Sequence, residues 1–524
     1  MKDNKIMHMP YKELLDFSPN SHQQLYSYVD HVENLLSEIK EAHIDIYYNF
    51  AKDEEVDIQK TRRLQKIKAE LINSSGFYKN IVECKFSNID VNVKQKVKAL
   101  KRLYVEQQVL NSEYLFRVEK KINLIASNHY KKIKLTVNQF ENEMRFQASA
   151  LKRKCLYGNL PMMGGELEKH IKELVQTQNQ IAKENKFDFY SNLLLENQGM
   201  EIPKLKALIM SFEERTRELY TYYYKKESDN LGLKKVRHFD LMHLFSRKEF
   251  EHPLLNIDST EIILQIKNFL SDYGFLKNKS NIQIEYLGKS NFPAVTMFKN
   301  KFEIKILINP SLKNLNILEV IFHEFGHALH AEYIRYDNFL FQGESTAFTE
   351  GMAQTIESLA KSREFLLHYI GLSENEYYEA LEIWNKYYLL FIRRICSAVM
   401  TKIEIYENGG ENINQIKFEN DLKFLLVNQD INEMRWSYQE LIGTKNQYSE
   451  ARLIAFFIAR SIESQYRELN QNNIIKFRDS LINSLWIPGG SIEWTEKIEE
   501  VLGNTLYIPS NGGLELGRGE NSVY

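Results

Sequence analysis

One five-residue segment, His323-Glu324-Phe325-Gly326-His327, constrains the fold more than any other part of the chain. It spells H-E-x-x-H, and residues four apart in a helix lie on the same face. The two imidazoles can therefore share one metal ion if this segment is helical. Glu324, beside the first histidine, would then face the open position of that ion. This layout is typical of zinc hydrolases, in which the glutamate accepts a proton from the attacking water.

The residues around this segment predict a helix with one buried face. Residues 317–322 supply apolar side chains upstream, and a second helical run, residues 345–359, carries Glu350. Because a catalytic zinc site usually takes a third protein ligand, Glu350 is the preferred candidate, and Glu344 in the preceding turn is the alternative. The same pattern also arises by chance, so a helical structural protein without a metal site is a competing interpretation.

Two polar residues continue the second helical run on nearly the same face as Glu350. Gln354 follows one helical turn later and Glu357 two turns later, so both point toward the expected metal. Ligands of metal ions are commonly held in place by hydrogen bonds from their neighbours. We therefore expect Gln354 and Glu357 to orient the ligands rather than to bind the ion.

The two segments together resemble the signature of a known family. Residues 322–330, followed by residues 348–354, are similar to the motif of the thimet oligopeptidase and oligoendopeptidase F family and, more distantly, to angiotensin-converting enzyme. Members of this family are zinc metallopeptidases that mostly cleave short peptides. The resemblance implies a mostly α fold, with two largely helical halves around a deep substrate channel and a small β-sheet beside the metal helix.

Residue by residue, the resemblance implies one Zn²⁺ per chain with His323, His327 and Glu350 as its ligands. It implies Glu324 as the general base and His330 as a residue that packs behind the ligands. Relatives also place their small sheet just before the metal helix, with an exposed edge that pairs with the substrate backbone. Here residues 291–298 and 302–310 read as two strands in that position, and such an edge binds peptides through main-chain hydrogen bonds.

One departure from the family concerns the groups that contact the substrate. Roughly a hundred residues after the third ligand, relatives carry a histidine and closely spaced tyrosines that stabilise the oxyanion. In this chain the last histidine is His368, and Phe456 and Phe457 stand in the comparable region. Tyr448 and Arg452 share a helical face there and are the candidates for this role. A chain that keeps the hydrolytic residues but changes the residues that hold the substrate is more typical of a dedicated peptide-processing enzyme than of a general degradative one.

Composition predicts long helices with few interruptions. The 524 residues are 43% hydrophobic and include only 9 prolines and 22 glycines. Apolar residues recur every three or four positions in residues 21–48, 58–71, 91–125 and 135–154. A break at residues 157–165 predicts a hinge or loop, and Asn408-Gly409-Gly410 predicts a tight turn. We expect an N-terminal helical region over residues 1–200 and a catalytic region over 201–524, with interleaved halves.

Charge and cysteine content limit the partners and the compartment. The formal net charge of −2 gives no global attraction to nucleic acid or to acidic membranes. The cysteines Cys84, Cys155 and Cys396 are scattered, which favours a reducing environment. No apolar run is long enough for a signal or a membrane span. We therefore expect a cytoplasmic protein whose partner is a peptide substrate; the oligomeric state is left open.

The function predicted from these observations is that of a zinc metalloendopeptidase, an oligopeptidase that hydrolyses short peptides with metal-activated water. The first alternative is a peptide-binding protein that retains zinc but hydrolyses little or nothing, because the downstream histidine is missing. A second form of the enzyme would be a carboxydipeptidase, which requires a free carboxylate at the end of its substrate.

Overall fold

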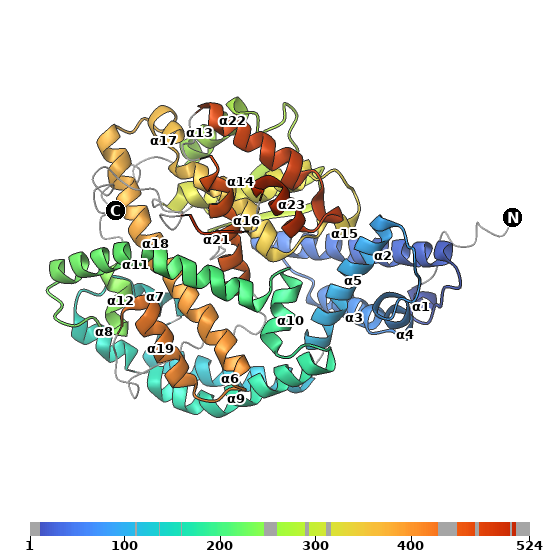
Figure 1. Ribbon diagram of the computed structural model, residues 1–524, viewed down its shortest axis with the longest axis horizontal. Helices are drawn as coiled ribbons and strands as arrows, with labels where there is room; N and C mark the ends of the chain where they lie inside the picture. The colour runs from blue at the N-terminus through green and yellow to red at the C-terminus, as the bar shows by residue number, and fades with distance from the viewer. Residues whose placement is uncertain are drawn as a thin grey trace. The chain divides into compact units, whose positions relative to one another are not determined.

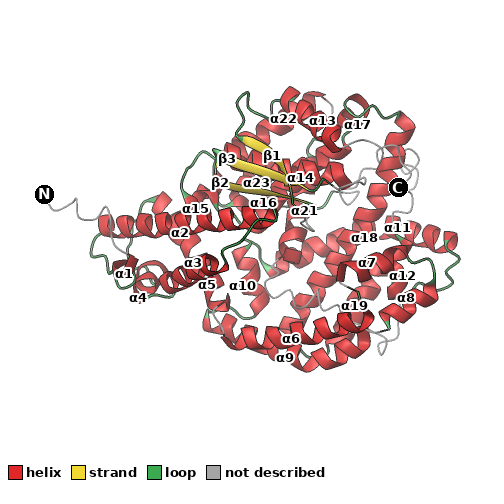
Figure 2. Cartoon of the chain, turned by 180° about the vertical axis from the view of Figure 1, so that it is seen from behind, coloured by secondary structure: helices red, strands yellow, loops and turns green. Residues whose placement is uncertain are grey.

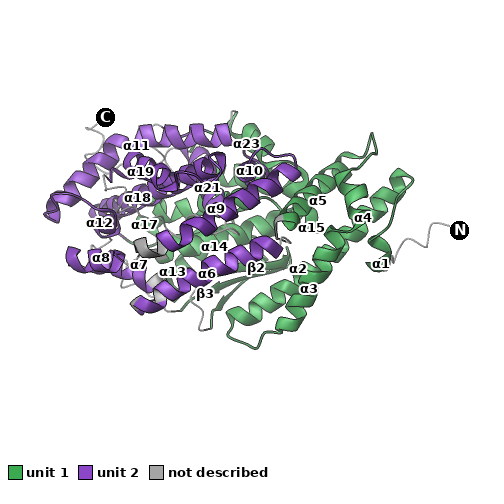
Figure 3. Cartoon of the chain, turned by 90° about the horizontal axis from the view of Figure 1, so that it is seen from below, with its two compact units in different colours: residues 1–111, 256–371, 465–506 green, residues 112–255, 372–464, 507–524 purple. Residues whose placement is uncertain are grey.

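The computed structural model describes residues 11–110, 113–135, 137–158, 160–245, 259–288, 293–310, 316–427, 448–466, 471–503 and 506–509. This part of the chain is mostly helical and contains one small sheet, as predicted (Figures 1 and 2). The chain forms two compact units that interleave in sequence (Figure 3). Unit 1 comprises residues 1–111, 256–371 and 465–506, and unit 2 comprises residues 112–255, 372–464 and 507–524.

Unit 1 contains the sheet and the H-E-x-x-H helix. Its helices before the sheet are α1 (Tyr11–Leu14), α2 (His22–Ala51), α3 (Ile58–Ile72), α4 (Ser75–Phe77), the π-helical turn η2 (Tyr78–Val82), α5 (Val91–Leu110) and α13 (Ser259–Asp272). The strands are β1 (Ile282–Tyr286), β2 (Ala294–Asn300) and β3 (Glu303–Ile308). The elements that follow are α14 (Asn316–Tyr333), α15 (Phe339–Gln342), α16 (Thr346–Glu357), η4 (Ser358–Lys361), α17 (Arg363–His368), α22 (Gln471–Ser480), η6 (Leu481–Trp486), η7 (Gly489–Ser491) and α23 (Trp494–Leu502).

Unit 2 contains helices and, within its described residues, no strand. Its helices are α6 (Glu113–Ile133), α7 (Val137–Phe146), α8 (Ala150–Tyr157), α9 (Leu160–Glu184), α10 (Tyr190–Asn197), α11 (Ile202–Asn230), α12 (His238–Leu244), α18 (Glu374–Glu407), α19 (Ile413–Leu425) and α21 (Tyr448–Ser464). No helix in the described residues of either unit is long and apolar enough to cross a membrane.

The helix ends follow local sequence chemistry. The side chain of Ser345 accepts a hydrogen bond from the backbone N–H of Phe348 and so caps the start of α16. The long helix α18 ends where Gly409 and Gly410 adopt positive φ angles of 62° and 83°, a conformation that glycine adopts without strain. The tight turn predicted at Asn408-Gly409-Gly410 is thus confirmed.

The sheet has the strand order β1-β3-β2. β1 runs parallel to β3, and β2 runs antiparallel to it, with Thr296 opposite Ile306. Ile306, Leu307 and Ile308 of β3 are fully buried, as expected for a central strand, whereas β2 lies at an edge. The two predicted strands are confirmed as β2 and β3, although Asn291 and Phe292 lie outside the described residues.

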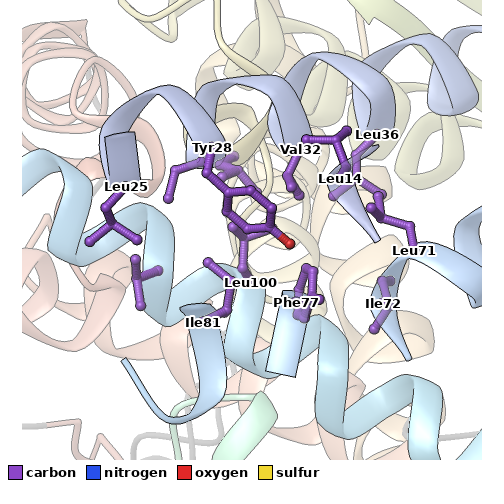
Figure 4. Packing of buried hydrophobic residues seen from close by; sticks show 13 residues of the cluster. Leu14, Leu25, Tyr28, Val32, Leu36, Leu71, Ile72, Phe77, Ile81 and Leu100 are labelled. Carbon is purple, nitrogen blue, oxygen red and sulfur yellow. The ribbon is translucent and has the colours of Figure 1, made fainter. Parts of the chain in front are cut away.

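The N-terminal helices of unit 1 share a core with a later segment. Leu25, Tyr28 and Val32 of α2 pack with Leu100 of α5 (Figure 4), and Leu340 of α15 belongs to the same buried cluster. A buried carboxylate also links these segments: Glu33 accepts a hydrogen bond from the backbone N–H of Leu340 at 2.8 Å, and Lys96 lies 2.7 Å from its other oxygen. The first two sequence segments of unit 1 therefore share a buried core.

One local prediction was right about a break between helices but wrong about its length. Residues 157–165 were predicted as a hinge or loop, but α8 continues to Tyr157 and α9 begins at Leu160. Pro161 is then the second residue of α9, where a proline costs little because the first N–H groups of a helix have no intrahelical partner. The proline therefore marks a helix start instead of a flexible segment.

Candidate metal centre

The H-E-x-x-H segment lies in the middle of α14, which packs against β2, β3 and α16. Phe322, Phe325 and Leu329 on this helix are 0–1% exposed. Figure 2 shows the helix beside the sheet. Burial of these apolar side chains fixes the rotation of α14 about its axis, which turns His323 and His327 toward α16.

A glycine within the motif allows α14 and α16 to approach closely. A Cβ atom at Gly326 would lie 2.6 Å from the Cα of Ala353 and 3.0 Å from its carbonyl oxygen. Those separations are shorter than van der Waals contact, so only glycine fits at this crossing. The close crossing brings Glu350 of α16 next to the two histidines of α14.

The three predicted metal ligands lie together. His323 Nε2 is 3.5 Å from Glu350 Oε2, and His327 Nε2 is 3.7 Å from Glu350 Oε1. One ligand atom from each of the three residues lies within 4.8 Å of the others. Ligand atoms about 2.0–2.2 Å from one zinc ion are roughly 3.3 Å apart in a tetrahedral site. Two imidazole nitrogens and a carboxylate thus fit a catalytic zinc site that leaves a fourth position open.

Glu357 contacts the first histidine from behind. Its Oε2 lies 3.0 Å from His323 Nδ1, so a proton on Nδ1 points to the carboxylate and leaves Nε2 free toward Glu350. Carboxylate–histidine pairs of this kind commonly orient a metal ligand. Gln354, one turn earlier on α16, is half-buried; its side chain makes no hydrogen bond within the described part of the chain, and its predicted role stays a prediction.

The two imidazoles respond in opposite ways to this environment. Burial opposes the charged form of His323, but the carboxylates of Glu350 and Glu357 outweigh it and raise its pKa to about 10. Burial and the neighbouring His323 lower the pKa of His327 to about 3. Together with Glu324, the site holds more carboxylates than cationic side chains, and a divalent cation would offset this excess negative charge.

Glu324 has a partner that sequence reasoning missed. The Thr296 hydroxyl of β2 donates a hydrogen bond to Glu324 Oε2 at 2.6 Å and lies 2.9 Å from the backbone oxygen of the same residue. Burial raises the pKa of Glu324, and this hydrogen bond opposes the rise. A carboxylate with a raised pKa is better suited to accept and return a proton near neutral pH. The strand predicted before the metal helix was the available signal for such a partner.

The alternative ligand Glu344 has other partners. His330 Nε2 lies 2.9 Å from Glu344 Oε2, and Lys497 Nζ of α23 lies 2.5 Å from Oε1. Lys497 also donates to the carbonyl oxygen of Leu485 at 2.9 Å. His330 thus packs behind the motif and, with Glu344 and Lys497, links α14 to the C-terminal segment of unit 1.

The two oxyanion candidates lie in unit 2 on α21. The guanidinium of Arg452 lies 4.9 Å from the centre of the Phe391 ring on α18, and Arg452 is half-buried. Tyr448 begins α21, and its side chain lies outside the described residues. Phe456 and Phe457 are buried in this unit and pack against Phe212 of α11. The roles proposed for Tyr448 and Arg452 stay predictions.

Comparison with known proteins gives a likeness in structure but none in sequence. No protein-family model matches the chain, and no curated protein matches its sequence. Many solved structures match, and three of them illustrate a likeness over almost the whole chain. A carboxypeptidase of Pyrococcus furiosus has 12% identity and a TM-score of 0.65, and the match covers 95% of this chain and 98% of that one.

The other two structures agree with this result. An M32 carboxypeptidase of Deinococcus radiodurans R1 has 11% identity and a TM-score of 0.63, with 94% and 96% of the two chains covered. Metallocarboxypeptidase 1 of Trypanosoma cruzi has 12% identity and a TM-score of 0.65, with 94% and 98% covered. The chain therefore shares its fold with these three carboxypeptidases, whereas the resemblance to the thimet oligopeptidase and oligoendopeptidase F family stays a prediction.

Proposed function

We propose that this protein is a zinc-dependent peptidase that hydrolyses short peptides. The observation that carries the proposal is the convergence of His323, His327 and Glu350 beside Glu324. The likeness in fold to three carboxypeptidases supports it. A fold alone does not define a reaction, so the argument depends on this set of side chains.

Each residue of the site has a distinct role in the proposed reaction. His323, His327 and Glu350 would hold the zinc ion, which would supply Lewis acidity to the scissile carbonyl and the attacking water. Glu324 accepts a proton from that water and returns it to the leaving amine nitrogen. Thr296 fixes the orientation of the Glu324 carboxylate through its hydrogen bond to Oε2.

The edge strand β2 is a suitable holder for the substrate backbone. It carries Thr296 and lies at the edge of the sheet, and no other strand of the described residues pairs with its outer main-chain groups. An extended peptide that pairs with such an edge gains affinity irrespective of its side chains. Tyr448 or Arg452 would stabilise the oxyanion by donating hydrogen bonds.

Two modes of cleavage are compatible with this site. The motif resemblance supports an oligopeptidase that cuts within short peptides, with narrow specificity because its oxyanion group differs from that of relatives. The names of the three structural neighbours favour carboxypeptidase action. The two modes differ in whether the substrate needs a free C-terminal carboxylate.

A mixed peptide library tests the proposal directly. Each peptide is offered with a free and with an amidated C-terminus to protein of known zinc content, and products are identified by mass spectrometry. Glu324→Gln is expected to keep one zinc per chain and to lose most turnover. Glu303→Gln, on the exposed side of β3, is the matched control and should keep full activity.

The outcomes separate the candidate functions. Cleavage of free peptides alone identifies a carboxypeptidase, and equal cleavage of both forms identifies an oligopeptidase. Stoichiometric zinc without any product would support the peptide-binding alternative. Full activity of Glu324→Gln would show that another group is the base, and absence of zinc binding would overturn the proposal.

A further inference from the structure

A cavity of about 450 Å³ lies beside the edge strand of unit 1. Its walls come from one face of α2, from residues 295–298 of β2 and from Phe339 of α15. The α2 side includes the apolar side chains of Leu36, Ile39 and Ile44. Thr296 also lines the cavity, and its hydroxyl donates to Glu324. The cavity is therefore separated from the proposed general base by a single side chain.

Three basic side chains line this cavity. Lys40 and His43 of α2 and Lys68 of α3 line it, and none of the described residues that line it is acidic. Lys40 is half-buried, and within the described residues no carboxylate lies within 4.0 Å of its ammonium group. Gln342 Oε1, at 3.5 Å, is a distant partner for it. The cavity thus presents a positive charge without a paired anion.

Aromatic rings partly replace the missing anion. The Lys40 ammonium lies 4.5 Å from the centre of the Phe298 ring and 5.8 Å from that of Phe339. Cation–π contacts of this kind recover only part of the hydration that a buried ammonium loses. Burial accordingly lowers the pKa of Lys40 to about 8, although Glu41 opposes the decrease. An incoming carboxylate would restore the charged state of this lysine.

His43 offers a hydrogen-bond donor in the same place. Its Nε2 atom is buried and has no hydrogen-bond partner in the described part of the chain. Burial and the charge of Lys68 lower the pKa of His43, and a backbone hydrogen bond with Thr61 opposes the decrease. A neutral imidazole carries one N–H, and on Nε2 this N–H would be available to a ligand. Burial raises the pKa of Glu106, and the charge of Lys68 opposes the rise, so Lys68 interacts with this carboxyl as well as with the cavity.

We propose that this cavity is a specificity pocket for a carboxylate of the peptide substrate. Lys40 provides the charge, His43 provides a hydrogen bond, and the apolar walls hold the chain around the carboxylate. The inference rests on the proposed peptidase function, because a peptide paired with the edge of β2 would pass this pocket. The carboxylate is either an acidic side chain or the C-terminus of the peptide.

The test measures binding and turnover separately. One short peptide that the protein binds is prepared with Glu or with Gln at each position in turn, and with a free or an amidated C-terminus. Binding is measured by calorimetry in the Glu324→Gln background, where peptides stay intact, and kcat/KM is measured in the active enzyme. Lys40→Met is expected to weaken binding of the carboxylate-bearing peptide by about tenfold to a hundredfold. The neutral peptide should bind equally well to Lys40→Met and to the protein that keeps Lys40.

Two further variants control for charge and folding. Lys40→Arg keeps the positive charge and should retain the preference. Lys66→Met removes one charge from α3 at an exposed position (side chain 77% accessible) that does not line the pocket, and it should change nothing. Thermal unfolding of each variant shows whether a loss of binding reflects a loss of structure.

Each outcome has a separate meaning. If the protein prefers Glu over Gln and Lys40→Met abolishes this preference, the pocket binds an acidic side chain. If amidation of the C-terminus weakens binding and Lys40→Met abolishes this effect, the pocket binds the C-terminal carboxylate. Cleavage that depends on neither carboxylate would overturn the role assigned to the pocket but would still support the peptidase function. Charge-dependent binding without any cleavage would overturn the peptidase function and keep the pocket.

Discussion

Glu324 receives a hydrogen bond from a residue outside the H-E-x-x-H motif. The bond from Thr296 stabilises the charged carboxylate, so Thr296→Val should raise the pKa of Glu324. The acidic limb of the kcat/KM profile would then move to higher pH, by about one pH unit for a bond to a charged group. Thr296→Ser keeps the hydroxyl and should keep the profile. An unchanged acidic limb in Thr296→Val would contradict this role.

A second residue-scale prediction concerns the buried charge of Lys497. This side chain is fully buried against Glu344, so Lys497→Met leaves that carboxylate buried without its lysine. The free energy of unfolding should fall by about 3–5 kcal/mol, measured by urea denaturation. Lys476→Met, at an exposed position of α22, should change it by less than about 0.5 kcal/mol. Equal stability of the two variants would show that the buried pair contributes little.

Spacing along the sequence was enough to find the side chains that helical geometry brings together. His323 and His327 are four residues apart on one helix, and Glu357 contacts His323 from the face of α16 predicted for it. Thr296 and Lys497 were missed because only tertiary packing brings them near their partners. Lys497 is 153 positions from Glu344, and no local pattern encodes such a contact.

At the scale of elements, the crossing of α14 and α16 sets the distance between the histidines and Glu350. Gly326→Ala would place a Cβ atom 2.6 Å from the Cα of Ala353, and the two helices would have to separate. We expect zinc affinity to fall by about tenfold or more, as for other changes that misplace ligands, and stability to fall by about 1–3 kcal/mol. Zinc titration with a competing chelator measures the first effect.

A matched glycine gives the control for this prediction. Gly165 in α9 has no atom within 4 Å of the Cβ position, so Gly165→Ala should stabilise its helix by up to about 1 kcal/mol. Zinc affinity should be unchanged. If Gly326→Ala bound zinc as tightly as Gly165→Ala, the close crossing would not be what positions Glu350.

Helices were easier to predict than their breaks. The periodicity of residues 21–48 and 58–71 corresponds to α2 and α3, since an amphipathic face is encoded locally. Residues 135–154 instead form parts of α7 and α8, because Ser149 caps a new helix by accepting a hydrogen bond from the backbone N–H of Lys152. β1 was not predicted, because its five residues gain their stability from pairing with β3.

At the scale of the whole molecule, each compact unit is built from segments that are far apart in the sequence. Composition predicted a mostly helical protein, and the described residues confirm it. Which segments form a compact unit depends on contacts between residues hundreds of positions apart, such as Glu33 with Leu340 and Arg102 with Glu493 at 2.9 Å. Periodicity carries no information about such pairs, so the substrate channel and the division at residue 200 stay predictions.

A fragment of residues 201–524 tests how far the zinc site depends on the N-terminal segment. The fragment contains every proposed ligand but lacks α2 and α5, which bury their apolar faces against Leu340 and supply Arg102 to Glu493. Without them, unit 1 loses part of its core and leaves charged partners unpaired. We expect no cooperative unfolding transition and no stoichiometric zinc in the isolated fragment, and recovery of both when residues 1–200 are co-expressed. A fragment that unfolds cooperatively with one bound zinc would instead show that the catalytic region folds independently.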